Sequence, residues 1–198
     1  MTRRTPELET FWQMCERRKE KRAQMSIEET RASFDAEMGA VPIAPDCAVE
    51  SFDLTGLPVE KITPKDAPAD RVLLYLHGGG HFFGSIKSHR HYVSRLAVAG
   101  NVTAFHIDYR LAPEHPYPAA VEDALKAYQY VLGQGIKPEN LIVGGESAGG
   151  NLAAALLLTL KEKGLPQPAG VYLLSPWLDM QTTAESYTRV GKRDPMIT

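Results

Sequence analysis

The stretch VGGESAGGNLAAALLL, residues 143–158, places one serine between a short apolar run of β type and an apolar helical run. Within it, GESAG (145–149) fits the pattern G-x-S-x-G, in which a serine lies on a tight turn from a strand into a helix. Gly145 and Gly149 carry no side chains that would collide across such a turn, and the helix N-terminus favours negative charge beside it. The stretch predicts Ser147 as a nucleophile. A serine that only caps a core helix is an alternative of similar weight.

Strands and helices alternate on both sides of this stretch. Apolar or alternating runs predict six strands, at residues 48–54, 57–63, 71–77, 101–109, 141–145 and 170–175. Helical spacing predicts helices at residues 89–100, 118–133 and 147–164. The third helix is apolar nearly all round at its centre, which favours burial. This order predicts an α/β fold, with a mostly parallel sheet and helices on both faces.

The first forty residues have a helical pattern of their own. One apolar stripe is formed by Leu8, Phe11, Trp12 and Cys15. Ser26 and Glu29 have the spacing of a capping box for a second helix, and Gly39 is suited to end it. We therefore assign residues 1–40 to an N-terminal helical segment and residues 41–198 to the core.

The composition is that of an ordinary globular chain. Of 198 residues, 43% are hydrophobic and 23% are charged, and the formal net charge is −2. A near-neutral chain gives no reason to expect a nucleic acid or an anionic membrane as a partner. Cys15 and Cys47 are too few for a disulfide framework. The basic N-terminal stretch does not develop the apolar run of a signal peptide, and we expect no membrane-spanning helix because no apolar run is long enough. We expect a cytoplasmic protein.

A second glycine-rich motif, HGGG (77–80), closes the third predicted strand. Three consecutive glycines are useful where backbone N–H groups must turn inward and approach a reacting oxygen closely. The donors would be the amides of Gly79 and Gly80, together with the amide of Ala148 after the serine. A phosphate-binding loop is a weaker interpretation, because no G-K-[ST] sequence follows.

Four motifs occur together in one order: HGGG, YRLAPEHPYPAA (109–120), GGESAGGNLA (144–153) and LLSPWLD (173–179). In this combination the chain resembles the hormone-sensitive lipase family of α/β-hydrolases from about residue 40 onward, and residues 1–40 resemble that family's helical cap. Glu146 is a small departure, because the family more often has aspartate there.

The resemblance implies a carboxylesterase that acts on short- to medium-chain acyl esters and uses no cofactor or metal. Ser147 would attack the carbonyl carbon and form an acyl-enzyme, while Gly79, Gly80 and Ala148 hold the oxyanion. His77 and Gly78 would support the glycine loop. Arg110 and Glu114 would hold the segment between strand and helix.

The base that should activate the serine is missing from its expected position. In this fold the order along the chain is serine, acid, histidine. Every histidine precedes Ser147: His77, His81, His89, His91, His106 and His115. We expect His81, with Phe82 and Phe83, to line the substrate pocket, although core packing is as good an interpretation for one phenylalanine.

Two further histidines and two aspartates are expected to have no catalytic role. His89 and His91 are expected on a solvated helix face. Asp179 should be structural and Asp194 a surface residue.

Six strands are also fewer than the eight of the sheet that this chain resembles. We therefore expect the acid and the histidine on further polypeptide, either continuous with this chain or packed against it. The strand GVYLLS (170–175) should then be an exposed apolar edge, open to a complementary C-terminal segment or to a second copy.

Two other functions stay open. The same family includes ligand receptors that keep the pocket and lose the histidine, so a non-catalytic small-molecule binding protein is the main rival. An amidase or an acyl-transfer enzyme would use the same residues.

Overall fold

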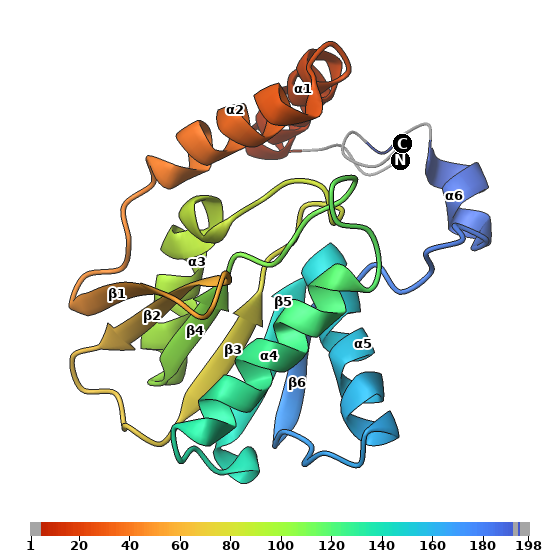
Figure 1. Cartoon of the computed structure of the whole chain (residues 1–198). Coiled ribbons are helices and arrows are strands. Elements are labelled where there is room, and N and C mark those ends of the chain that lie inside the picture. The colour runs from red at the N-terminus through yellow and green to blue at the C-terminus, as the bar shows by residue number, and fades with distance from the viewer. Residues whose placement is uncertain (1–4, 192–193, 195–198) are drawn as a thin grey trace. The chain divides into compact units, whose positions relative to one another are not determined.

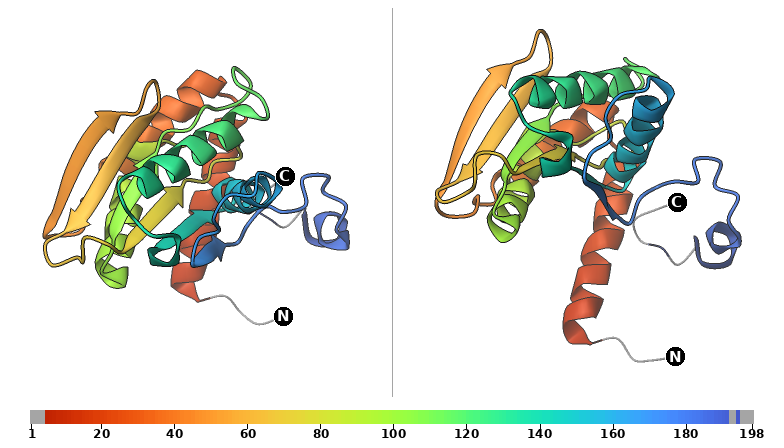
Figure 2. Two further views of the ribbon diagram at one scale, coloured as in Figure 1. Left: turned by 60° about the horizontal axis from the view of Figure 1, so that its bottom comes forward. Right: turned by 90° about the horizontal axis from the view of Figure 1, so that it is seen from below.

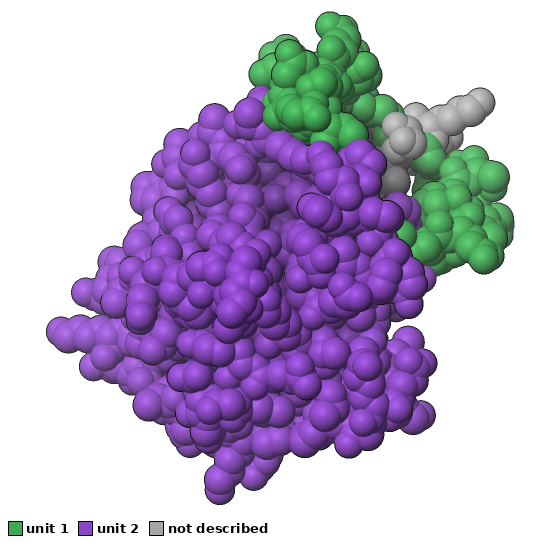
Figure 3. Space-filling view, viewed as in Figure 1, with its two compact units in different colours: residues 1–30, 179–198 green, residues 31–178 purple. Residues whose placement is uncertain are grey.

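The computed structural model describes residues 5–191 and 194 (Figure 1). The chain forms two compact units, residues 1–30 with 179–198 and residues 31–178, which Figure 3 colours separately. The first unit contains α1 (Pro6–Arg22) and α6 (Glu185–Val190), and α2 (Ile27–Gly39) crosses the boundary. The second contains β1 (Cys47–Asp53), β2 (Pro58–Pro64), β3 (Val72–Leu76), α3 (Ile86–Gly100), β4 (Thr103–Ile107), α4 (Ala119–Gly133), a 3₁₀ turn (Pro138–Asn140), β5 (Leu141–Glu146), α5 (Ala148–Glu162) and β6 (Gly170–Leu174). The predicted division at residue 40 stays a prediction.

All six predicted strands are present, and they form one sheet in the order β1-β2-β4-β3-β5-β6 (Figure 1). The pairs β3–β4, β3–β5 and β5–β6 are parallel, whereas β1–β2 and β2–β4 are antiparallel. The four strands that run parallel carry the serine corner and the glycine loop at their carboxyl ends. This is the edge at which open α/β sheets bind ligands.

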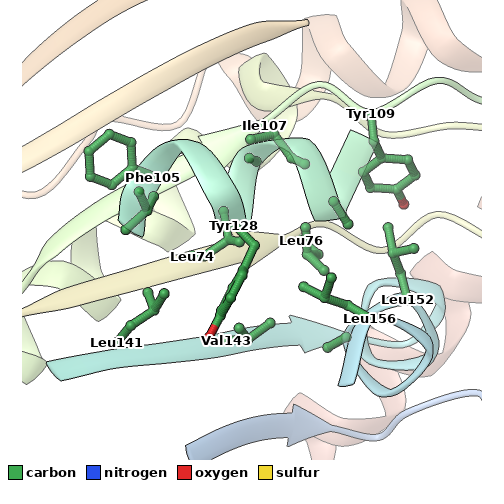
Figure 4. Close-up of a cluster of buried hydrophobic side chains, with 14 of the residues drawn as sticks. Leu74, Leu76, Phe105, Ile107, Tyr109, Tyr128, Leu141, Val143, Leu152 and Leu156 are labelled. Atoms are coloured by element: carbon green, nitrogen blue, oxygen red, sulfur yellow. The ribbon is translucent and has the colours of Figure 1, made fainter. Parts of the chain in front are cut away.

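Helices cover both faces of the sheet, as the alternation predicts (Figures 1 and 2). Successive residues of β3 point to opposite faces, so Leu74 packs with α4 and α5, while Leu73 packs with α3. The larger cluster lies on the α4–α5 side, and Figure 4 shows its side chains from β3, β4, β5 and both helices. The apolar runs of the parallel strands are continuous because both of their faces are buried.

Two elements begin two or three residues away from their predicted starts, for local reasons. Helix α3 begins at Ile86 rather than at His89, because Ser85 caps it and accepts hydrogen bonds from the amides of Lys87 and Ser88. Strand β4 starts at Thr103, since Asn101 ends α3 in a left-handed conformation.

Helix α5 is not buried all round, so that prediction is wrong. Leu152, Leu156 and Leu160 are buried against the sheet, but Leu158 on the other side of the helix is 63% exposed. The cause is geometric: the helix lies on one face of the sheet, so its inward leucines are buried while its outward Leu158 stays exposed among the described residues.

The last strand has an open edge. In the described part of the chain β6 pairs only with β5. Val171, Tyr172 and Leu174 are all about two-fifths exposed, at 39%, 37% and 42%. Because Val171 and Tyr172 point to opposite faces, β6 is partly exposed on both faces, although α5 packs against it.

The N-terminal helices form where predicted. The capping box is present: the Glu29 amide donates to Ser26 Oγ at 3.1 Å, and the Ser26 amide donates to the Glu29 carboxylate at 2.8 Å. The apolar stripe of α1 is only partly buried, since Cys15 is 6% exposed but Phe11 is 51% exposed. Within residues 5–191 and 194, no helix is both long enough and apolar enough to span a membrane.

Candidate active site

Ser147 lies at the corner between β5 and α5 in an unusual backbone conformation, with φ 53° and ψ −119°. Such a conformation is costly for a residue with a side chain and persists only where the surroundings impose it. Here the Ser147 amide donates to the carbonyl of Leu174 at 3.0 Å, and its carbonyl accepts from the Trp177 amide at 2.9 Å. The side chain makes no capping hydrogen bond. The hydroxyl is therefore not used to cap α5, which argues against the structural alternative.

The glycines of GESAG allow the corner to close. A Cβ on Gly145 would strike the backbone of Gly149, and a Cβ on Gly149 would strike the carbonyls of Leu76 and His77. The first turn of α5 is thus pressed against the carboxyl end of β3 without any intervening side chain. The Ala148 amide belongs to this first turn, whose N–H groups have no partner within the helix itself.

The glycine loop follows β3 directly. Gly79 and Gly80 have φ values of +115° and +62°, which side chains rarely adopt. The carbonyl of Gly79 accepts from the amides of Phe82 and Phe83 at 3.1 and 3.0 Å, so the loop is a tight turn. Among the described residues, no acceptor binds the amides of Gly79 and Gly80. They are available to an oxyanion.

His77 is fully buried behind the loop. Its Nδ1–H donates to the Gly78 carbonyl at 2.8 Å, its ring stacks on Tyr109 with 4.3 Å between centroids, and the Tyr109 hydroxyl donates to its carbonyl at 2.7 Å. Burial, with a smaller contribution from His89, lowers the pKa of His77 to about 3. His77 is therefore neutral.

The three residues expected in the pocket lie on the turn after the glycines. His81 has a positive φ of 65°, and its Nε2 lies 3.3 Å from Asn151 Oδ1, near the first turn of α5. Burial lowers the pKa of His81, although the bond to Asn151 opposes this. Phe82 is 38% exposed, while Phe83 packs edge-on against Phe34 at 5.1 Å between centroids. Of the two phenylalanines, Phe83 has the packing role.

The prediction of a solvated face for His89 and His91 is wrong. The side chain of His89 is only 12% exposed, its ring stacks on His77 at 5.2 Å, and its Nε2 lies 3.0 Å from the Glu146 carboxylate. His91 is half-buried, and its Nδ1 has no partner among the described residues. One signal could have identified His89: it lies four residues before Val93, a buried residue on the same helical face.

Glu146 and Tyr75 were not singled out by sequence reasoning as site residues, yet both lie beside the loop. The Glu146 carboxylate accepts from the Gly78 amide and from the Tyr75 hydroxyl in addition to His89. Burial raises the pKa of Glu146, but the bonds and charge of these three partners outweigh it, and the net pKa is lowered. The carboxylate is therefore ionised at neutral pH.

Two arginine contacts hold the segment between β4 and α4. Arg110 binds the Asp123 carboxylate at 2.9 Å. Arg31 binds both oxygens of Glu114 at 2.8 Å and donates to the Phe82 carbonyl at 2.7 Å. The Arg31 hydrogen bonds lower the pKa of Glu114 to about 2. Arg31 thus connects this segment to the turn after the glycine loop.

The arrangement can hold a developing negative oxygen, but it lacks an adjacent base in the described part of the chain. No histidine among residues 5–191 and 194 hydrogen bonds to the Ser147 hydroxyl. Asp179 accepts from the amides of Gln181, Thr183 and Ala184, so it orders its own turn. The described residues also contain no cluster of three or more side chains able to hold a metal ion.

Comparison with known proteins identifies the fold and the family. A family model described as alpha/beta hydrolase fold matches residues 73–198. An esterase of Acinetobacter venetianus is 40% identical over 156 residues, covering 79% of this chain and 51% of that protein. The hormone-sensitive lipase of Mus musculus is 34% identical over 139 residues, covering 68% of this chain and 18% of that protein.

Solved structures extend the likeness to the whole chain. The crystal structure of an esterase from the bacterial hormone-sensitive lipase family has 38% identity and a TM-score of 0.89, and the match covers 100% of this chain and 66% of that one. The chain spans about half the length of the bacterial curated relatives that it matches. It belongs to the α/β-hydrolase fold family, in its hormone-sensitive lipase branch.

Proposed function

We propose that this chain is the nucleophile-bearing part of a carboxylic ester hydrolase that acts on short- to medium-chain acyl esters. One observation carries the proposal: Ser147 is held at a strained corner with no capping bond, next to a loop whose Gly79 and Gly80 amides have no described acceptor. The esterases among its relatives support the same reaction class.

Each site residue has a proposed role. Ser147 attacks the ester carbonyl, its proton passes through the histidine of the added segment to the departing alcohol, and water then hydrolyses the acyl-enzyme to the acid and free serine. The amides of Gly79, Gly80 and Ala148 stabilise the tetrahedral oxyanion. His77 and Gly78 support the loop, and His81 and Phe82 line the substrate pocket, with Phe83 behind them. Removal of one oxyanion donor typically costs about 3–4 kcal/mol of transition-state stabilisation.

We propose that the acid and the histidine come from polypeptide outside these 198 residues. Three observations support this: no described histidine reaches Ser147, β6 is an open apolar edge, and the match covers 66% of the esterase structure. The added segment would extend the sheet beyond β6 and cover the exposed parts of that strand. A cytoplasmic location is also proposed, supported by two free cysteines.

The test is hydrolysis of short-chain p-nitrophenyl esters, combined with labelling of Ser147 by a fluorophosphonate. We expect turnover and stoichiometric labelling when the segment that completes the sheet is supplied, and neither in Ser147→Ala. Turnover by a lone 21.8 kDa monomer would refute the need for a second segment. Turnover that survives Ser147→Ala would refute the mechanism.

A non-catalytic binding protein is the second candidate, favoured by the lack of a histidine at Ser147 in the described residues. Such a protein would bind esters or related small molecules reversibly and would label slowly even in its complete form. Matched ester and amide substrates would then separate an esterase from an amidase.

A further inference from the structure

One partly buried carboxylate connects the nucleophile corner to the glycine loop without belonging to the reaction proposed above. Glu146 directly precedes Ser147, and its side chain is 20% exposed. Its partners come from three separate elements: the Tyr75 hydroxyl from β3, the Gly78 amide from the loop, and His89 Nε2 from α3. Charge-assisted bonds of this kind are stronger than bonds between neutral groups.

The loop is built around this carboxylate. A Cβ on Gly78 would collide with the Glu146 carboxylate and would lie only 2.9 Å from the Glu146 carbonyl oxygen. Gly78 does not have a positive φ, so close approach, rather than backbone conformation, is what requires glycine there. The position of Gly78 is therefore set by Glu146, and the next two residues are the proposed oxyanion donors.

His89 fixes the carboxylate from the other side. Its Nδ1 faces the Ser85 carbonyl at 3.3 Å and the Ser88 hydroxyl at 3.1 Å, and its ring stacks on His77. These contacts orient the imidazole so that Nε2–H points at Glu146. His89 lies in the first turn of α3, a capped helix, whereas its partner Glu146 is the last residue of β5. Both residues of the pair therefore stand on regular secondary structure.

We propose that Glu146 and His89 are positioning residues for the oxyanion loop. His89 holds the carboxylate, the carboxylate holds the Gly78 amide, and Gly78 directs the amides of Gly79 and Gly80 towards the reacting oxygen. Neither side chain touches the substrate. The kinetic part of this inference rests on the proposed function, whereas the structural part does not.

The structural test uses the chain with ¹⁵N-labelled glycine and needs no catalysis. Glu146→Gln weakens the charged acceptor, and His89→Phe keeps a ring for stacking but removes the donor. We expect both to shift the amide signals of Gly79 and Gly80. His89→Gln, which restores an N–H donor, should return them towards the unmodified positions. Glu139→Gln and His115→Phe make the same chemical changes at exposed sites and should leave them unmoved.

Unmoved Gly79 and Gly80 signals in folded Glu146→Gln would overturn the inference, whatever the behaviour of His89→Phe. The kinetic test measures ester hydrolysis by the enzyme in its active form. Glu146→Gln and His89→Phe should lower kcat about 10- to 100-fold with KM changed less than about twofold, since misplacement by about 1 Å costs up to that much. His89→Gln should recover most of kcat.

A purely structural role predicts a different result: lower melting temperatures with unchanged kcat in the cold, which would also overturn the inference. If the unmodified protein hydrolyses no ester, the proposed function fails, and the glycine signals still decide whether the loop depends on Glu146 and His89.

Discussion

Ser147→Gly is expected to give a more stable protein than Ser147→Ala, although both variants lose the same hydroxyl. The corner has φ 53° and ψ −119°, which glycine adopts with little strain and alanine does not. Strain of this kind costs about 1–3 kcal/mol. Glycine loses about 0.5–1 kcal/mol of this advantage, because its unfolded chain is more flexible. The net difference in unfolding free energy should be about 1 kcal/mol in favour of glycine.

Equilibrium unfolding in urea, followed by tryptophan fluorescence, measures this difference directly. A gain of 1 kcal/mol corresponds to a rise in melting temperature of about 2–4 °C for a chain of this size. Ser147→Ala keeps the strain, so its stability should lie within about 0.5 kcal/mol of the unmodified protein. Should glycine prove equal to or less stable than alanine, the corner is not strained and the argument that its surroundings impose the conformation is refuted.

Three further changes test other parts of the structure. Gly149→Ala places a Cβ against the backbone at the end of β3 and should cost at least about 1–3 kcal/mol in urea unfolding, whereas Gly133→Ala, with open space around it, should cost nothing. Burial raises the pKa of Asp108 to about 6, so the folded protein binds this proton more tightly and loses stability as the pH rises from about 4 to about 6. Asp108→Asn should therefore be about 1–3 kcal/mol more stable than the unmodified protein at pH 7 and equal to it at pH 4, and a difference that does not vary with pH would contradict this. Val171→Lys should reduce self-association in sedimentation velocity by charging the open edge of β6, while Val98→Lys, on an exposed position of α3, should not.

Much of the fold could be predicted because its signals are local. The parallel strands are continuous apolar runs. Helix α2 begins after its cap at Ser26 and ends at Gly39, and both signals come from residues close in sequence. The exposure of Leu158 could not be predicted, because a leucine-rich helix has the same sequence whether it is covered on one side or on two. Burial at that position depends on which other elements lie nearby.

Some residues of the candidate site could likewise be predicted from local sequence, and others could not. Ser147, Gly79 and Gly80 lie in short motifs whose chemistry follows from neighbouring residues. The pair formed by His89 and Glu146 does not, because these residues are far apart in sequence and meet only when α3 packs on the face of the sheet formed by β2, β3 and β4. In HRH (89–91) two histidines flank an arginine, a pattern typical of an exposed helix face. Only the helical spacing between His89 and the buried Val93 indicates that His89 lies on the buried face.

The hydrogen bonds of Ser147 have a consequence for the proposed ester hydrolysis. Its amide and carbonyl are both held by residues at and just beyond the end of β6, so fraying of that outermost strand would let the corner relax. A chain segment that docks along β6 would suppress fraying and, in the same event, tighten the reactive alcohol in its poised geometry. Docking of the segment and ordering of Ser147 for reaction would then occur in the same step. A chain without the segment would react only slowly with esters.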